Sequence, residues 1–269
     1  MLRRLFLVGL LVVSCRPSGR PTDRPPARIV SLLPSFTEIL FAIGAGDQVV
    51  GRTQWCDYPP AALSVASVGE GLPPNVEAVA ARHPDLVLLY NSGVNVTAAK
   101  QFERIGIRAV LIDLNRLEDL GPAARTLGRL TGHERAADSL ARVMEGFLHQ
   151  PPPSSTTLAF VVWDDPPIII GRGSYLDQLA NQAGARNVFS DVPAPSAQVS
   201  LETIVARDPR WIAVLSDSGT APSFAKRREW RAVPAVRDAH FLLLTGSLFG
   251  RPGPRSGEAI AQLRRMLAR

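Results

Sequence analysis

The pattern of hydrophobic and polar positions repeats once along the chain. Residues 75–90 read NVEAVAARHPDLVLLY, and residues 200–215 read SLETIVARDPRWIAVL. Each copy starts with a helix-capping residue and carries a glutamate, Glu77 or Glu202, in what would be the first helical turn. A proline then ends the helix, and the apolar run after it has the length and composition of a buried strand. The repeat therefore predicts two lobes of similar construction.

Alternating strand and helix patterns surround each copy of the repeat. The first series covers residues 28–116 and the second covers residues 151–269. In the first series, Ser35 and Glu38 have the S-x-x-E spacing of a capping box ahead of an apolar helix. Alternating strands and helices are typical of a mostly parallel sheet. We therefore expect an α/β protein with two lobes.

The segment between the two series has a helical pattern. Residues 117–150 contain no proline after Pro122, and their apolar residues recur at helical spacing. This predicts one long helix that joins the lobes, with Thr131-Gly132 as the point where it would break. A stiff connection of this kind would hold a largely preformed ligand cleft between the lobes, beside the C-terminal ends of the strands.

The N-terminus has the pattern of an export signal. Residues 1–14 combine two arginines with an apolar run too short to span a bilayer, and Cys15 follows at once. This matches a bacterial lipoprotein signal, in which the cysteine is acylated; the alternative is an ordinary secretory signal with an incidental cysteine. Residues 15–27 are rich in proline, arginine and small polar residues, so we expect a flexible tether to a membrane surface.

Charge and cysteine content argue against a nucleic-acid-binding protein and against a disulfide-stabilised one. The formal net charge of +6 falls by two, to +4, once Arg3 and Arg4 leave with the signal. The basic residues are scattered and not interleaved with aromatics, which argues against a nucleic-acid partner. Cys15 and Cys56 are the two cysteines, so an acylated Cys15 leaves Cys56 without a disulfide partner.

Several segments together resemble a known family. They are the signal with its cysteine, RIVSLLPSFTEILFAIGAGDQVVG, the WCDYP loop, both repeat copies and the connecting helix. They resemble the helical-backbone substrate-binding proteins of ABC importers, and within them the cobalamin-binding periplasmic proteins most closely. The likeness extends from Arg28 to the C-terminus. It implies an extracytoplasmic protein that performs no chemistry and delivers cobalamin or a related corrinoid to a permease dimer with its ATPase subunits.

The resemblance also assigns roles to residues. It implies that Glu77 and Glu202 dock on arginines of the permease; the alternative is that both are only first-turn helix charges. Positions after strand ends predict a cleft in which aromatic rings face a flat macrocycle and polar groups meet its periphery. The predicted ligand contacts are Ser35, Trp55, Asp57, Tyr58, Tyr90, Asn91, Trp163, Asp165, Ser247, Phe249 and Arg251.

The predicted cleft is less aromatic than the resemblance implies. The loops at residues 68–75 and 192–199 contain no aromatic residue, and Ser247-Leu248 stands where an acidic residue and a tryptophan would be expected. A ferric siderophore or haem, which related members carry, is therefore the alternative ligand.

Two other classes of function have weaker signals. Asp217-Ser218-Gly219 has the form of an aspartic-protease half-site, but that chemistry needs two carboxylates and the sequence has no second copy. No two histidines have the spacing typical of residues that coordinate one metal ion, so we expect no resident cofactor or metal ion. Any metal would arrive inside an organic ligand. The histidines are His83, His133, His149 and His240.

Overall fold

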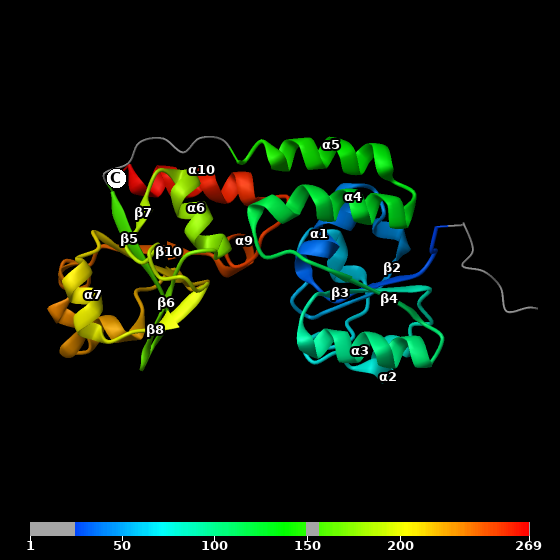
Figure 1. The fold of residues 1–269 in the computed structure, drawn as a ribbon, viewed down its shortest axis with the longest axis horizontal. Helices are drawn as coiled ribbons and strands as arrows, with labels where there is room; N and C mark the ends of the chain where they lie inside the picture. The colour runs from blue at the N-terminus through cyan, green and yellow to red at the C-terminus, as the bar shows by residue number, and fades with distance from the viewer. Residues whose placement is uncertain (1–24, 149–155, 269) are drawn as a thin grey trace, which may run out of the picture.

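The structure, a computed structural model, describes residues 25–148 and 156–268. Two α/β lobes lie side by side along the long axis of the molecule (Figure 1). This confirms the predicted fold class of two lobes with mostly parallel sheets. The predicted signal, Cys15 and the tether as far as residue 24 lie outside the described residues.

The N-terminal lobe is built on a parallel four-stranded sheet in the order β2-β1-β3-β4. Alternate side chains of β3 point to opposite faces: Leu86 and Leu88 belong to one buried cluster, and Val87 and Leu89 to another. Helices α1 and α4 cover the first face, and α2 and α3 cover the second (Figure 1). The strands are β1 (Ile29–Ser31), β2 (Val49–Arg52), β3 (Leu86–Tyr90) and β4 (Arg108–Ile112). The helices are α1 (Pro34–Ala42), α2 (Val76–Ala80), α3 (Gly93–Arg104), α4 (Leu120–Thr131) and α5 (Glu134–Glu145), with 3-10 turns at Gly46–Gln48, Pro60–Ser64 and Leu117–Asp119.

The C-terminal lobe has a mixed six-stranded sheet. Its path is β10-β9-β5-β6-β8, and β7 pairs with β5. Strands β10, β9, β5 and β7 run parallel, whereas β6 and β8 are antiparallel additions that the sequence pattern does not predict. The strands are β5 (Thr157–Asp164), β6 (Pro167–Ile170), β7 (Arg186–Asn187), β8 (Ser196–Gln198), β9 (Trp211–Leu215) and β10 (Phe241–Leu244). The helices are α6 (Tyr175–Ala183), α7 (Leu201–Arg207), α8 (Pro234–Arg237), α9 (Gly246–Phe249) and α10 (Ser256–Leu267), with 3-10 turns at Ser223–Lys226 and Glu229–Ala232.

The prediction of one long helix over residues 117–150 needs correction. The segment forms two helices, α4 and α5, that turn back on each other at Gly132 (Figure 1). Gly132 has a φ of 77°, a left-handed conformation that ends a helix and suits glycine. Gly128 then lets α4 approach Ala137 of α5 closely. The break falls where the sequence indicates it, and the hairpin packs on the N-terminal lobe.

Both copies of the repeat form the predicted helix and strand. Asn75 caps α2 by accepting a hydrogen bond from the backbone N–H of Ala78 at 2.9 Å, and Ser200 caps α7 by accepting one from Thr203 at 3.3 Å. Strands β3 and β9 follow these helices. The two lobes therefore share one local plan.

The capping box predicted for Ser35 and Glu38 does not form. Helix α1 begins at Pro34 after Leu33, which makes no side-chain cap. The Ser35 hydroxyl is buried without a hydrogen-bond partner. Glu38 is buried too, and its carboxylate reaches the other lobe instead of its own helix start.

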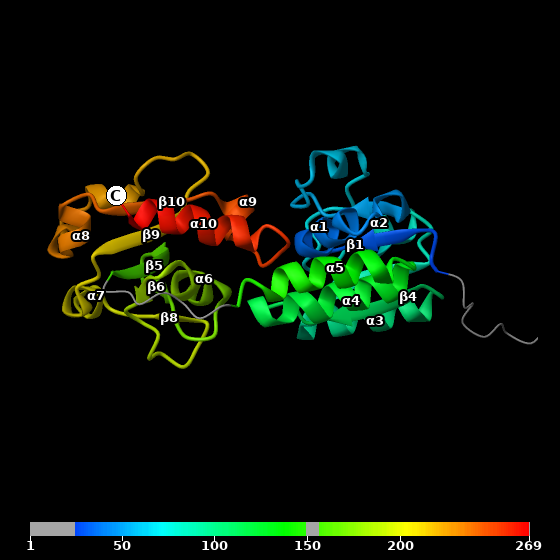
Figure 2. The same ribbon diagram turned by 90° about the horizontal axis from the view of Figure 1, so that it is seen from above.

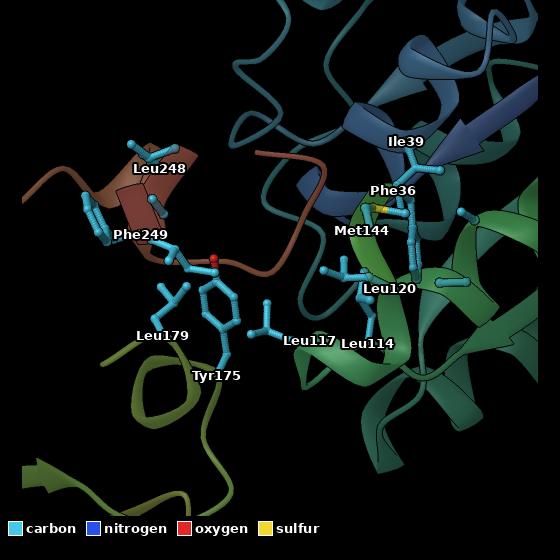
Figure 3. Packing of buried hydrophobic residues seen from close by; sticks show 14 of the residues in the cluster. Phe36, Ile39, Leu114, Leu117, Leu120, Met144, Tyr175, Leu179, Leu248 and Phe249 are labelled. Atoms are coloured by element: carbon cyan, nitrogen blue, oxygen red, sulfur yellow. The ribbon is translucent and has the colours of Figure 1, made fainter. Parts of the chain in front are cut away.

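One hydrophobic core passes through both lobes. Phe36 and Leu120 of the first lobe belong to the same buried cluster as Tyr175 and Phe249 of the second, with Leu117 between them (Figure 3). Removing apolar side chains of this size from water stabilises the folded state by about 1.5–3 kcal/mol each. The lobes are therefore held by apolar packing, which favours a cleft of nearly fixed shape.

Candidate functional site

A cleft opens between the lobes where parallel strands end. One hollow of about 390 Å³ and another of about 510 Å³ share Trp55, Gly246 and Arg251, so we treat them as one cleft. The loop between β2 and α2 and the loop between β9 and α8 rise on the same side of the molecule (Figure 2). The lining residues are Leu32, Leu33, Pro34, Trp55, Asp57, Glu70, Gly71, Leu72, Tyr90, Asn95, Asp217, Gly246, Ser247, Gly250 and Arg251.

Large apolar side chains in the cleft are left open to solvent. Trp55 and Leu72 are each 57% exposed, on a loop that follows β2. Exposed apolar surface inside a concave site is typical of a surface that a ligand covers. The indole of Trp55 offers a flat face suited to a planar ring system.

The loop that carries Trp55 is tied to its own lobe. Arg52 donates to the backbone oxygens of Ala62 at 2.8 Å and Thr53 at 2.9 Å. Cys56 is fully buried, with its sulfur 3.2 Å from the Thr53 hydroxyl. The thiol thus packs as part of the loop, and the neighbouring tryptophan is presented on a supported backbone.

A largely buried ion cluster, which includes the lining residue Arg251, joins the two lobes. Glu38 of α1 accepts hydrogen bonds from Arg251 at 3.1 Å and from Arg255 at 2.9 and 2.7 Å. The guanidinium of Arg255 also lies 4.0 Å above the ring of Tyr58. Burial opposes the charge of Arg255, but the hydrogen bonds and charge of Glu38 outweigh it and raise the pKa of Arg255. We call Glu38, Arg251 and Arg255 the interlobe cluster.

Arg251 reaches across the cleft to the tryptophan loop. Its Nη1 donates to the backbone oxygen of Trp55 at 3.0 Å, and its Nη2 pairs with the carboxylate of Asp57. Its side chain is 16% exposed. Arg251 therefore lines the cleft while holding both lobes together.

A second polar contact joins the lobes away from the cleft. Gln178 of α6 accepts a hydrogen bond from the backbone N–H of Leu117 at 2.8 Å and donates to Glu118 at 2.5 Å. Burial disfavours the charge on Glu118, but hydrogen bonds from Gln178, the backbone and Arg116 outweigh it and lower its pKa. Nearby, Tyr175 bonds to Ser256 at 3.0 Å, and burial raises the pKa of Tyr175.

The structure brings three of the six predicted contacts of the first lobe to the cleft. Trp55, Asp57 and Tyr90 line it, and Tyr58 lies under Arg255 beside it. The hydroxyl of Tyr90 bonds to Asn115. Ser35, which is buried, and Asn91 are not among the lining residues; the amide of Asn91 donates to Asp113 at 3.0 Å.

The predicted contacts of the second lobe are only partly brought together. Ser247 and Arg251 line the cleft. Phe249 is fully buried in the core, so its ring has no surface for a ligand (Figure 3). Trp163 is exposed, but neither it nor Asp165 lines the cleft. The indole of Trp163 donates to the backbone oxygen of Asp165 at 2.8 Å.

Several lining residues were not predicted from the sequence, and three of them come from the loop at residues 68–75, which contains no aromatic residue. These three are Glu70, Gly71 and Leu72, and the loop reads VGEGLPPN. Gly71 has a φ of 88°, and a Cβ there would lie 2.5 Å from a carbon of Thr53. The clustered glycines and prolines of that loop were the available signal.

The Asp217 turn has a structural role at the cleft. Its carboxylate accepts a hydrogen bond from the backbone N–H of Gly246 at 2.7 Å, at the start of α9. Ser218 bonds to Thr220 at 2.7 Å within the same turn. These contacts join the end of β9 to the segment after β10.

The two repeat glutamates, Glu77 on α2 and Glu202 on α7, are both exposed, one on each lobe. Hydrogen bonds from its own backbone N–H and from Ser200 lower the pKa of Glu202. In the described part of the chain, no three His, Cys, Asp or Glu side chains gather as a metal site. That part also contains no helix with the length and apolarity needed to cross a bilayer.

Comparisons with known proteins agree with this architecture. The model of the periplasmic binding protein family matches residues 29–248. A vitamin B12-binding protein of Pectobacterium carotovorum is 29% identical over 86% of this chain and 84% of its own. An uncharacterized ABC transporter substrate-binding lipoprotein of Bacillus subtilis, YvrC, is 31% identical over 89% of this chain and 79% of its own. The periplasmic haem-binding protein HutB of Vibrio cholerae has the same fold, with a TM-score of 0.80, 20% identity, and coverage of 90% and 99%.

Proposed function

Because the chain belongs to the periplasmic binding protein family, we propose that it is the substrate-binding protein of an ABC importer. It captures cobalamin or a related corrinoid and delivers it to a permease dimer driven by ATPase subunits. The names of the relatives from Pectobacterium and Bacillus support this cargo and this partner. The family consists of binding proteins, and we propose that this chain performs no chemistry.

The observation that carries the proposal is the exposed apolar surface of the cleft. Trp55 and Leu72 stand open between lobes that share one core, so a flat ligand can bind without a large closure. The amide groups around a corrin ring are hydrogen-bonding partners for the polar side chains that line the cleft, such as Asn95 and Ser247.

Haem or a ferric siderophore is the second candidate ligand. The likeness to a haem-binding protein supports it at the level of the fold. The phenol of Tyr90 lies at the cleft, and a tyrosine oxygen is a known ligand of ferric haem iron. An aspartic-type hydrolase function is not proposed. Asp217 accepts a hydrogen bond from the backbone N–H of Gly246, and the sequence contains no second half-site.

Delivery requires contact with the permease and a place outside the cytoplasm. We propose that Glu77 and Glu202 dock on basic residues of a two-fold symmetric permease, since each sits in the first turn of the equivalent helix of its lobe. We also propose that Cys15 carries a lipid that holds the protein at the membrane surface.

A fluorescence titration tests the ligand. Residues 16–269 are titrated with cyanocobalamin while tryptophan emission is followed. We expect saturable quenching with a Kd on the order of 1 μM or tighter, and binding at least about ten-fold weaker for Trp55→Ala. The matched control is Trp163→Ala, an exposed tryptophan away from the lining residues, which should retain the affinity. No quenching in a folded protein rejects cobalamin, and haem and ferric hydroxamates are then tested in the same way.

A further inference from the structure

Carboxylates predominate among the charged residues that line the cleft. Asp57, Glu70 and Asp217 line it, and Arg251 is the basic residue among the described lining residues. A charged ligand would therefore meet three acids and one base. If Arg251 is free to pair with a ligand, the cleft can attract anions. If Arg251 is already paired within the protein, the carboxylates make the cleft unfavourable for anions.

Arg251 is committed to the protein. Its Nε donates to Glu38, its Nη1 to the backbone oxygen of Trp55, and its Nη2 to Asp57. Each of its three nitrogens thus has an acceptor in the opposite lobe. These contacts use three of the five N–H groups of the guanidinium, and its charge is already balanced by Glu38, which is 3% exposed, and by Asp57, which is 47% exposed. Arg251 therefore connects the two lobes and is poorly suited to bind an anionic ligand.

Among the described residues, neither Glu70 nor Asp217 forms an ion pair with a basic side chain. Asp217 accepts a hydrogen bond from the backbone N–H of Gly246 at 2.7 Å, which leaves its charge in place. Glu70 is exposed, and its contact is with the amide of Gln54 at 3.4 Å. The field at the cleft is therefore set by carboxylates, in a hollow where a bound ligand excludes part of the water that screens charge.

We propose that the cleft selects metal complexes with a neutral or cationic periphery and rejects those that carry carboxylates. The inference rests on the proposed function and names the chemical class of its ligand. Like charges across an interface disfavour binding, so the acids act against anionic competitors. Complexes rimmed by amides, or cationic hydroxamates, fit this rule. Porphyrins with two propionates do not.

A matched pair of corrinoids isolates the effect of charge. Cyanocobalamin and its monocarboxylic acid derivative, in which one side-chain amide is hydrolysed, differ by one negative charge and almost no volume. Residues 16–269 are titrated with each by isothermal calorimetry at pH 7.5 and low ionic strength. We expect the acid to bind at least about ten-fold more weakly, which corresponds to about 1.4 kcal/mol. Added salt should narrow the difference, because it screens the charges.

Variants assign the discrimination to the named acids. In Glu70→Gln/Asp217→Asn, the amide at 217 can still accept the hydrogen bond from Gly246, while two negative charges are gone. The ratio of the two dissociation constants should fall several-fold toward one. Glu134→Gln is the matched control, since it removes an acid from the start of α5, outside the lining residues. It should leave the ratio where it was.

Ferrioxamine B, a cation, and haemin extend the comparison beyond corrinoids. The proposal predicts that the tightest ligand of the four carries no free carboxylate. It is overturned if haemin binds tightest, if the acid binds as well as cyanocobalamin, or if the double variant leaves the ratio unchanged. Failure of the corrinoid assignment gives a different result: ferrioxamine B binds and cyanocobalamin does not. If none of the four binds, the proposed function fails, and this inference with it.

Discussion

We predict that the substitution Glu38→Gln in the interlobe cluster lowers the stability of the folded protein. The carboxylate is 3% exposed and receives three hydrogen bonds from two arginines of the other lobe. Glutamine keeps the volume and one acceptor oxygen but removes the charge. Arg255 then has no carboxylate partner among the described residues, while Arg251 keeps Asp57.

The size of the effect follows from the burial of these groups. Removing one partner of a buried ion pair typically costs about 3–5 kcal/mol, because the remaining charge is left uncompensated. Both arginine side chains are 16% exposed, and Arg251 keeps one partner, so we expect a loss of stability near the lower end, about 3 kcal/mol. For a chain of this size that lowers the Tm by roughly 6–12 °C.

Urea unfolding, followed by circular dichroism, measures this loss. Glu118→Gln is the matched control: it also removes a carboxylate at the lobe junction, but Glu118 is 48% exposed and pairs with an exposed Arg116. Exposed pairs contribute about 0–1 kcal/mol. Replacing both charges, as in Glu38→Met/Arg255→Met, should recover part of the loss, since no unpaired charge remains at position 255. If Glu38→Gln costs no more than Glu118→Gln, the cluster does not hold the lobes.

Three further predictions concern the cleft loop, acid stability and docking. Gly71→Ala should lower the free energy of unfolding by about 1–2 kcal/mol, because φ is 88° there and a Cβ would meet a side-chain carbon at 2.5 Å; thermal melts measure this, and an unchanged Tm would contradict it. Hydrogen bonding by Arg207 lowers the pKa of Asp191, so its stabilising effect is present above the unfolded pKa and lost as the pH falls through the lower folded value. The stability difference between the native protein and Asp191→Asn should therefore shrink as melts are taken from about pH 5 to about pH 3, and a difference that grows would refute the sign. Glu77→Arg and Glu202→Arg should each reduce cobalamin uptake by cells that carry the cognate permease by about ten-fold or more while cargo binding is kept; normal uptake would exclude docking through that glutamate.

Local patterns predicted the parts of the fold that depend on neighbouring residues. The caps at Asn75 and Ser200, the helices after them and the buried strands all follow from short-range rules. The break at Gly132 was also visible, because glycine commonly ends helices. The direction of the chain after the break was not visible, since the packing of α4 against α5 depends on tertiary contacts.

The candidate site was predictable only where its residues carry an aromatic or loop signal. Trp55 was found because a tryptophan among polar loop residues is hard to place in a core. Phe249 was misjudged because its burial in the core depends on tertiary packing, which the sequence around it does not reveal. Glu38 was assigned to a local capping box, and its partners lie more than 200 positions away in the chain, at Arg251 and Arg255. Sequence spacing cannot reveal such a contact.

The most direct test of the central claim is a crystal structure of residues 16–269 grown with cyanocobalamin, with anomalous data collected at the cobalt absorption edge. The account predicts one strong cobalt peak inside the cleft, bounded by Trp55, Leu72 and Tyr90 of the first lobe and by Ser247 and Arg251 of the second. A cobalt peak elsewhere on the molecule, or an empty cleft at saturating ligand, would contradict it.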